Sequence, residues 1–286
     1  MFVSERRACR VINQPRMTQR YKTKQPDRDK MLTAEINKLA KKHKRYGYRM
    51  ITAKLRQAGW VVNHKRVQRI WQKEGLQVPY RRKFKKAKGS SDNGCSVKKT
   101  EFINHVWTYD FISDQTEDGR GLKLLTVLDE FTRESLLIEV GRSIKAKDVI
   151  SVLEYLFMVR GVPMFIRSDN GSEFIADAIK RWLKDRGVET LYIEPGSPWE
   201  NGYIESFNGK LRDGVLDREV FYSVNEAKVL VENWRLEYNN HRPHSSLGYM
   251  TPAAFAASCI PEASPTAQPQ EYRTRNVDNS LIICGT

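Results

Sequence analysis

Three acidic residues in this chain, Asp110, Asp169 and Glu205, stand in sequence contexts that suit carboxylate ligands of metal ions. Asp110 lies within the apolar run HVWTYDFI, and Asp169 opens an Asp-Asn-Gly turn that follows MFIRS. Glu205 lies in the helix-like stretch NGYIESFNGKLRDGVL, and 35 residues separate it from Asp169. Carboxylates from two strands and a helix can together hold two Mg²⁺ or Mn²⁺ ions. Such ions activate a water or a 3′-hydroxyl for in-line phosphoryl displacement.

Each of these acids, taken alone, also has an ordinary structural explanation. The chain contains 34 acidic residues, so a pair at this separation is expected by chance. Asp110 can be a buried capping acid, Asp169 a turn residue, and Glu205 part of a solvated helix face, since turns favour Asp-Asn-Gly for conformational reasons. The metal hypothesis therefore depends on whether the surrounding elements bring all three together.

The composition indicates a folded protein that works in a reducing compartment. With 286 residues and 40% hydrophobic residues, the chain can form one large core and a smaller domain. No apolar run approaches the roughly 20 residues of a membrane span, and the start MFVSERRACR lacks a signal-peptide core. Four scattered cysteines (Cys9, Cys95, Cys259 and Cys284) form neither a disulfide framework nor a metal knuckle. We expect no membrane association and a cytoplasmic location.

Lysine and arginine are concentrated in the first 100 residues. This part carries 29 Lys and Arg against 6 Asp and Glu, a net charge of +23, whereas the rest carries 20 against 28, a net charge of −8. A basic front part favours a polyanionic partner, most often nucleic acid. The alternative is a basic surface or tail that serves only solubility, but the basic residues are interleaved with periodic apolar ones, which favours a folded DNA-binding domain.

The front part is predicted to contain a basic arm (1–30), a helical domain (31–76) and a basic linker (77–100). Apolar periodicity predicts three short helices between 33 and 75, with Thr33 capping the first and Asn63 the third. The third helix exposes basic side chains, as does the second helix of a helix-turn-helix DNA reader. The predicted DNA contacts on it are His64, Lys65, Arg66 and Arg69. A three-helix bundle that binds protein, or nothing, is the alternative.

The main domain (101–257) is predicted to be α/β. Three strands joined by short turns precede alternating helices and strands; the expected strands are 105–113, 122–129, 135–140, 164–168 and 188–193. Such a mixed sheet has the ribonuclease H-like topology. Asp110 falls on the first strand and Asp169 at the carboxyl end of the fourth, the edge where α/β sheets hold their sites.

The stretch around Glu205 is predicted to be a helix behind a Pro/Gly-rich loop. Asn201, Glu205, Asn208 and Arg212 are spaced i, i+4, i+7 and i+11, so we expect them on one polar face. Arg212 is expected to hold substrate phosphate, and Asn201 and Asn208 are predicted to contact DNA as well. In the loop 195–201, Trp199 is expected to contact a base of a bound strand. A further amphipathic helix (225–240), an extended arm with a short helix (241–255) and a disordered tail (258–286) complete the chain.

The chain resembles the transposases of bacterial insertion sequences, specifically the second-frame (OrfB) product of the IS-three family. The matching strings extend from ERRACRV near the start to YNNHRPHSSLGYMTPAAF, and include HVWTYDF, LTVLDEFTRESL, IRSDNGSEF and EPGSPWENGYIESFNGKLRD. The resemblance implies an integrase catalytic core whose metal ligands are Asp110, Asp169 and Glu205. Arg212 matches the basic residue that the family places seven positions after its Glu.

The family resemblance also implies partners and cofactors. Two Mg²⁺ or Mn²⁺ ions per site are expected, and no zinc, because His43, His64, Cys9 and Cys95 lack the spacing of the zinc module of retroviral integrases. Members of the family cut element ends and join the freed 3′-hydroxyl to target DNA. They usually act fused to a first-frame (OrfA) product. We therefore expect a nucleoid-associated protein that binds terminal inverted repeats and target DNA as a homo-oligomer.

Two other functions remain open from the sequence. A DNA-binding regulator with an inactive core would retain the front domain, although regulators seldom keep all three acids. A structure-selective nuclease would share the core, although the resemblance continues well beyond it, through HRPHSSLGY. Analysis of reaction products separates nicking from joining.

Overall fold

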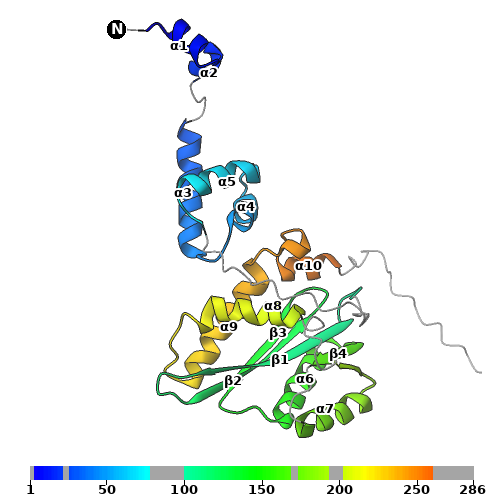
Figure 1. The fold of residues 1–286 in the computed structure, drawn as a ribbon. Helices are drawn as coiled ribbons and strands as arrows, with labels where there is room; N and C mark the ends of the chain where they lie inside the picture. Colours follow the sequence, from blue (N-terminus) through cyan, green and yellow to red (C-terminus); the bar gives the residue numbers. More distant parts are fainter. Residues whose placement is uncertain (1–2, 22–25, 78–99, 169–172, 193–201, 260–286) are drawn as a thin grey trace, which may run out of the picture.

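The structure of the chain is a computed structural model, and it describes residues 3–21, 26–77, 100–168, 173–192 and 202–259. Within these ranges a helical front part precedes a mixed α/β core (Figure 1). Most of the predicted linker and nearly all of the predicted tail lie outside the described residues, so those two predictions are not addressed by the structure.

The core is built on a five-stranded sheet with the strand order β3-β2-β1-β4-β5. β1 and β2 pair antiparallel, as do β2 and β3, whereas β4 is parallel to both β1 and β5. The strands are β1 (Val106–Gln115), β2 (Gly121–Asp129), β3 (Ser135–Gly141), β4 (Phe165–Ser168) and β5 (Glu189–Tyr192). An antiparallel meander extended by parallel strands is the predicted ribonuclease H-like arrangement, and each predicted strand boundary lies within two residues of the observed one.

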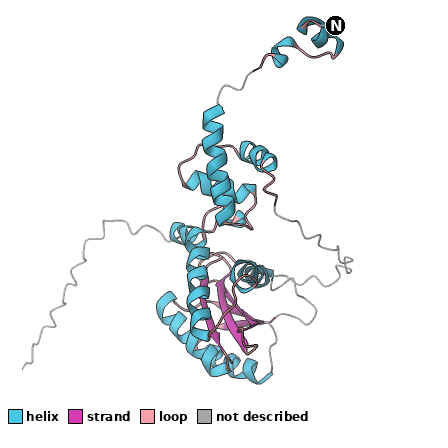
Figure 2. Ribbon diagram, turned by 90° about the vertical axis from the view of Figure 1, so that its left-hand side faces the viewer, coloured by secondary structure: helices cyan, strands magenta, loops and turns pink. Residues whose placement is uncertain are grey.

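Both faces of the sheet are covered by helices, as Figure 2 shows from the side. The covering helices are α6 (Ala146–Arg160), α7 (Glu173–Asp185), α8 (Gly202–Leu211) and α9 (Val224–His241). Alternate residues of β1 face opposite layers: Trp107 and Tyr109 pack with α6 and α7, whereas Ile112 packs with α8 and α9. Burial on both faces explains why the central strand carries apolar residues on both of its sides.

The helix α8 continues directly into a short π-helical segment, η2 (Arg212–Leu216), which the sequence did not predict. Gly214 in this segment lies against the indole of Trp234 on α9. A Cβ atom at position 214 would approach Trp234 Nε1 to 2.1 Å, so only glycine fits here without rearrangement. This close contact with Trp234 fixes the π-helical turn that carries Arg212. Such turns often occur near functional sites.

Replacement of Gly214 with alanine should destabilise the fold by about 1–3 kcal/mol, because the new methyl group overpacks the α9 interface. Urea unfolding measures this change. The matched control is Gly209→Ala on α8, where nothing lies within 4 Å of the position that the new methyl group would take. That substitution should stabilise by roughly 0.5–1 kcal/mol, because alanine favours the helix. Equal behaviour of the two variants would contradict the packing argument.

The helical front domain packs α3 (Pro26–Lys42), α4 (Tyr48–Gln57) and α5 (His64–Lys73) around one small core. The buried residues of this core are Leu32, Ile36, Tyr46, Ile51, Leu55, Val62, Val67 and Trp71. Asn63 caps α5 as predicted, since its side-chain oxygen accepts a hydrogen bond from the Lys65 backbone N–H at 3.0 Å. Two short helices, α1 (Glu5–Val11) and α2 (Arg16–Gln19), precede this domain.

The predicted role of Thr33 as a helix cap is wrong. The helix α3 already begins at Pro26, seven residues earlier, so Thr33 lies in its interior. The Thr33 hydroxyl instead donates to the Asp29 carbonyl oxygen at 2.8 Å, one turn back. Apolar periodicity identified the helix, but a capping residue type alone did not locate its start.

The front domain contacts the core around the end of α9. Arg45 pairs with Asp213 at 3.1 Å, and the Lys54 ammonium donates to the His241 carbonyl at 3.2 Å. The Arg242 guanidinium lies over the Tyr46 ring, 5.1 Å from its centroid. These contacts are mostly polar and partly exposed, which is typical of interfaces between domains of one chain.

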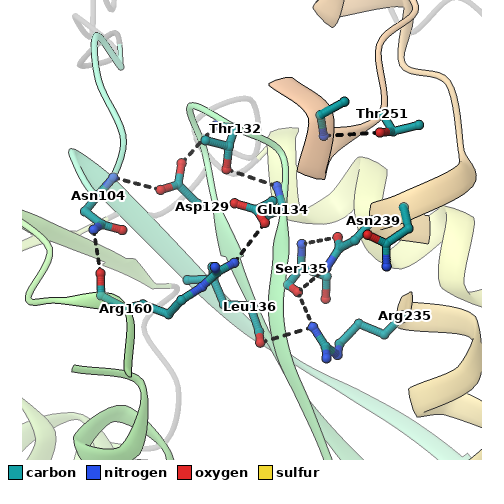
Figure 3. A network of polar contacts seen from close by, with 12 residues as sticks. Asn104, Asp129, Thr132, Glu134, Ser135, Leu136, Arg160, Arg235, Asn239 and Thr251 are labelled. Atoms are coloured by element: carbon teal, nitrogen blue, oxygen red, sulfur yellow. Dashed lines mark hydrogen bonds and ion pairs between the residues drawn. The ribbon is translucent and has the colours of Figure 1, made fainter. Parts of the chain in front are cut away.

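The turn between β2 and β3 is held by a network of polar contacts (Figure 3). Asp129 accepts hydrogen bonds from the backbone N–H groups of Asn104, Phe131 and Thr132 at 2.7–2.9 Å. Glu134 pairs with Arg160 at 2.8 Å on the neighbouring helix α6. The string LDEFTRES therefore specifies a rigid turn.

The end of β3 near this turn is tied to α9. Asn239 accepts from the Ser135 N–H and donates to the Ser135 carbonyl, both at 2.9 Å, and Arg235 donates to the same carbonyl at 2.8 Å (Figure 3). The chain then passes through η3 (Ser245–Leu247) to α10 (Pro252–Cys259). The extended arm and short helix predicted for 241–255 are therefore observed, with a 3-10 turn between them.

Candidate active site

Asp110 lies in the middle of the central strand β1, opposite Thr126 of β2. Its carboxylate is half-buried, and both oxygens accept hydrogen bonds. Oδ1 accepts from the Phe111 backbone N–H and Oδ2 from the Asn208 side-chain amide, each at 2.7 Å. A carboxylate offers about four lone-pair directions, so it can accept hydrogen bonds and bind a cation at the same time.

Asn208 joins this carboxylate to helix α8. Its Nδ2 donates to Asp110, while its Oδ1 lies 3.1 Å from the Thr126 hydroxyl, which is also 3.1 Å from the Asp110 carbonyl oxygen. The Asn208 side chain is buried, so it does not share an exposed face with Glu205 as the sequence spacing had suggested. Contact of Asn208 with DNA stays a prediction, and its observed position is that of a residue that orients Asp110.

Glu205 is exposed on α8, one turn before Asn208. Ile204 and Phe207 on the same helix are fully buried against the sheet, which fixes the rotation of α8. Side chains three positions apart on a helix are neighbours. The Asp110–Asn208 hydrogen bond therefore brings the Glu205 turn of α8 next to Asp110.

Arg212, at the start of the π-helical segment, is exposed, and its guanidinium donates to the Ser113 carbonyl of β1 at 3.2 Å. Asp169, Trp199 and Asn201 lie outside the described residues. The predicted roles of these four residues are not tested by the structure and stay predictions.

A buried ion pair joins the end of β2 to β4. Glu130, directly after β2, is fully buried, and its carboxylate lies 3.3 Å from the buried Arg167 guanidinium on β4. Burial raises the pKa of Glu130 to about 7, against the opposing effects of Arg167 and Arg133. Arg167 is followed by Ser168 and then by Asp169, so this pair supports the strand end that precedes a predicted ligand.

The raised pKa of Glu130 predicts how stability depends on pH. The folded chain binds a proton there more tightly than the unfolded chain, whose ordinary value is 4.5. Stability from this group is therefore present below about pH 4.5 and is lost as the pH rises through about 7. Relative to Glu130→Gln, the wild type should lose roughly 1–3 kcal/mol across this window in urea titrations. Parallel pH profiles of the two proteins would contradict this expectation.

On α5 the predicted DNA contacts differ in their surroundings. His64, Lys65 and Arg69 are exposed, whereas Arg66 is half-buried and pairs with Asp29 of α3. The first three are therefore available to a phosphate backbone, and Arg66 also joins two helices of the domain. Their DNA contacts stay predictions.

Sequence reasoning missed Thr126 and a group of cations near α8. Thr126 stands in the apolar run LLTVLD, where a single hydroxyl in a buried strand was the available signal. The cations are Arg49, Arg133, Lys210 and Arg242, which line one cavity although they lie far apart in the sequence. No local pattern connects them, because the fold alone brings them together.

The two described acids offer hard oxygen donors, which suit Mg²⁺ or Mn²⁺. Within the described ranges there is no cluster of three or more His, Cys, Asp or Glu side chains. The third predicted ligand, Asp169, lies outside those ranges. In the described part of the chain, no helix is long and apolar enough to cross a membrane.

Family models match three parts of the chain. An HTH-like domain matches residues 26–84, and two integrase core domain models match residues 103–198 and 186–252. The first match covers the helices α3 to α5, and the other two cover the sheet and its helices to the end of η3.

Proteins of bacterial insertion elements resemble the chain over most of its length. A 39.2 kDa protein of insertion element IS476 from Xanthomonas euvesicatoria is 38% identical, over 98% of this chain and 76% of that protein. A 31.7 kDa protein of insertion element IS407 from Burkholderia multivorans is 36% identical, over 94% and 96%. The transposase for insertion sequence element IS904 from Lactococcus lactis is 26% identical, over 82% and 96%.

Solved integrase structures are more distant. The HTLV-2 integrase catalytic core domain in complex with magnesium superposes with a TM-score of 0.43 at 16% identity, covering 55% of this chain and 99% of that one. The simian T-cell lymphotropic virus intasome in complex with the PP2A regulatory subunit B56 gamma gives 0.49 at 15%, covering 84% and 80%. On the family models and the insertion-element relatives, the chain belongs to the insertion-sequence transposases, with a helix-turn-helix domain in front of an integrase core.

Proposed function

We propose that this chain is a metal-dependent polynucleotidyl transferase that cuts insertion-sequence ends and joins them to target DNA. The observation that supports it most directly is the 2.7 Å hydrogen bond between Asn208 and Asp110, which ties the Glu205 helix to the central strand. The helix turn that carries Glu205 thereby comes close to Asp110 on β1, although the two acids are far apart in the sequence.

The sequence position of Asp169 supports it as the third acid of the site. Asp169 directly follows Ser168, the last residue of β4, and β4 pairs with the strand that carries Asp110. We infer that Asp110, Asp169 and Glu205 would together hold the metal ions of the site.

Bound Mg²⁺ or Mn²⁺ would lower the pKa of a water or 3′-hydroxyl and stabilise charge on the phosphate. The chain's own residues orient the reaction. Asn208 and the Phe111 N–H hold the Asp110 carboxylate in place, and Arg212 steadies a neighbouring phosphate. The nucleophile is a water for cleavage and a DNA 3′-hydroxyl for joining, so no covalent link between protein and DNA forms.

The front domain and the loop before α8 would bind DNA around this site. His64, Lys65 and Arg69 on α5 face solvent and are placed to contact an element end. Trp199 is proposed to contact a base near the scissile phosphate, and Asn201 and Asn208 are proposed as further DNA contacts. A first-frame product is the proposed partner, and synapsis of two ends requires a homo-oligomer on DNA.

A strand-transfer assay tests this function. Labelled element ends, taken from the DNA that flanks the gene, are incubated with target DNA in Mg²⁺ and then in Mn²⁺, with and without chelator. Glu205→Gln serves as the inactive comparison, because it keeps the side-chain size and removes a ligand charge. Joined products should form with the wild type and disappear with chelator and with Glu205→Gln.

Other outcomes identify other functions. Metal-dependent nicks without joined products, also with a first-frame protein fused, would favour a structure-selective nuclease. Tight, salt-sensitive DNA binding without either product would favour a regulator. Recovery of joining only in the fusion would show that the chain is the catalytic part of a two-frame enzyme.

A further inference from the structure

A basic cavity of about 810 Å³ lies where α8, the β2–β3 turn, the segment after α9 and the start of α4 meet. Its cationic lining residues are Arg49, Arg133, Lys210 and Arg242, and we call this site the basic cavity. Among the described residues that line it there is no Asp or Glu. Its size is within the range of small-ligand sites.

The positive charges of this cavity lie close enough to disturb one another. Burial, Arg242 and Arg133 lower the pKa of Lys210 to about 8. Burial, Lys210, Arg242 and Arg133 lower the pKa of His244, another lining residue, to about 3. No carboxylate is among the groups that lower either pKa. Asp213 and Glu237 line a neighbouring cavity together with Lys210 and Arg242. A bound anion in the basic cavity would add a counter-charge where none of the described lining residues is acidic.

Arg133 and Lys210 each contact a neutral group at the cavity, and Arg133 also acts on the buried carboxyl of Glu130. The Arg133 guanidinium lies 3.6 Å from the Tyr203 ring centroid. Arg133 belongs to the turn between β2 and β3, which the polar contacts of Figure 3 hold in place. Lys210 donates to the Ser206 hydroxyl at 3.0 Å. The amino end of the ten-residue helix α4 also lines the cavity, and its N-cap, Gly47, provides no side-chain cap. Backbone N–H groups at such an end favour anions.

Aromatic side chains complete the lining. Tyr48, Tyr203 and Tyr249 line the cavity and are partly or largely exposed. Cationic groups combined with accessible aromatic rings are the usual means by which proteins bind unpaired nucleotides, because the rings stack on bases and the cations bind phosphates. An inorganic anion would use only the cations.

The position of the cavity on α8 connects it with the proposed active site. Tyr203, Ser206 and Lys210 recur at i, i+3 and i+7, along a different face from Glu205. Lys210 follows Glu205 by five residues, about 7.5 Å along the helix axis, and a helix with its side chains is about 10–12 Å across. A few nucleotides of one strand can therefore reach from the metal ligands to the cavity.

We propose that the basic cavity binds one phosphodiester and its unstacked base in a DNA strand that also passes Glu205. This inference rests on the proposed function and adds a nucleotide subsite to it. The front domain contributes Arg49 and the start of α4, so strand binding here would depend on how that domain packs against the core.

The test measures binding of the full-length chain to a fluorescently labelled, short single-stranded oligonucleotide by anisotropy, without metal ions. Lys210→Gln should weaken binding about tenfold, whereas Lys210→Arg should retain it. The matched control is Lys184→Gln at the end of α7, an exposed lysine with the same loss of charge, which should change affinity less than about twofold. Thermal melting of each variant confirms that it is folded.

The pH dependence gives a second readout. As the pH rises from about 7 to 9, wild-type affinity should fall, because Lys210 loses its proton near pH 8. Lys210→Arg should remove this fall, because a guanidinium stays charged. Charged and titratable groups that line the basic cavity with Lys210 are Arg49, Arg133, Arg242, His244, Tyr48, Tyr203, Tyr238 and Tyr249. Those that line the neighbouring cavity with it are Lys42, His43, Lys44, Arg45, Tyr46, Asp213, Arg218 and Glu237. His244 stays neutral in this range, and burial raises the pKa of Tyr238 further above it.

Competition with inorganic phosphate and with a free deoxynucleoside monophosphate separates the possible ligands. The proposal expects the oligonucleotide to bind most tightly and the monophosphate to compete better than phosphate. Equal loss of affinity in Lys210→Gln and Lys184→Gln, or equal competition by phosphate and monophosphate, would overturn it.

The result is independent of strand transfer. Glu205→Gln should keep wild-type affinity for the oligonucleotide even where joining is abolished. If Lys210→Gln weakens oligonucleotide binding but no joined product ever forms, the nucleotide subsite is supported and the proposed function is not. If joining requires Glu205 but oligonucleotide binding and joining are unchanged in Lys210→Gln, the proposed function is supported and the nucleotide subsite is not.

Discussion

Asp110→Asn is expected to lower strand transfer on the order of 10³-fold or more while DNA affinity in the absence of metal stays unchanged. The substitution keeps the side-chain shape and removes the negative charge. It also replaces one carboxylate oxygen with an N–H donor at a position where Asn208 already donates at 2.7 Å. Both changes oppose cation binding on the central strand. Single-turnover strand transfer with pre-bound DNA measures the effect.

Asp114→Asn provides the matched control for this prediction. Asp114 lies on the same strand as Asp110, four residues further on, and loses the same charge in the substitution. It makes its local bond to the Gln115 N–H and has no contact with α8 among its hydrogen bonds. The rate of strand transfer by the Asp114→Asn variant should lie within about threefold of the wild-type rate. Comparable losses in the two variants would indicate a general effect of charge on DNA binding, and the ligand role of Asp110 would be abandoned.

The sheet was predictable because the apolar pattern of each strand has one dominant explanation. Trp107 and Tyr109 face one layer and Ile112 the other, so a strand apolar on both faces had to be central. The short turns that join β1, β2 and β3 then required an antiparallel meander. The position of Asp110 on β1 followed directly from these two features.

The side-chain environment of the site was less predictable. Helical spacing placed Asn208 with Glu205, but residues three positions apart differ by about 60° of rotation around the helix, and packing decides which of them turns inward. Ile204, Phe207 and Leu211 are buried on one side, and Asn208 lies at the edge of that buried stripe. Its role becomes visible only from its hydrogen bonds with Asp110 on β1 and Thr126 on β2.

The basic cavity was beyond sequence reasoning for a different reason. Arg133 belongs to a turn, Lys210 to a helix, and Arg242 to the segment after α9. Each is an ordinary surface cation by sequence. Their common environment depends on how these elements pack against one another and against the front domain, which contributes Arg49.

Asn208→Ala is expected to lower strand transfer about 10–100-fold and to raise the metal concentration needed for half-maximal rate. The substitution removes the donor to Asp110 Oδ2 and the acceptor beside the Thr126 hydroxyl. The Asp110 carboxylate then loses one of the bonds that set its orientation. A residue that acts only through stability would leave the metal dependence unchanged, so a metal titration separates the two roles. Asn240→Ala, at an exposed amide on α9, is the control and should alter neither value.

Asn208→Asp distinguishes orientation from packing more sharply, because the introduced carboxyl would lie within hydrogen-bond distance of Asp110. Two carboxylates this close cannot both stay ionised, so one of them must bind a proton with a raised pKa. When the introduced group is protonated it can donate to Asp110 as the amide does. Strand transfer by Asn208→Asp should therefore recover as the pH falls from about 8 to 6, whereas Asn208→Ala should show no such recovery. If both variants follow the wild-type pH profile, Asn208 contributes packing alone, and the geometry of Asp110 must be set by the β1 backbone.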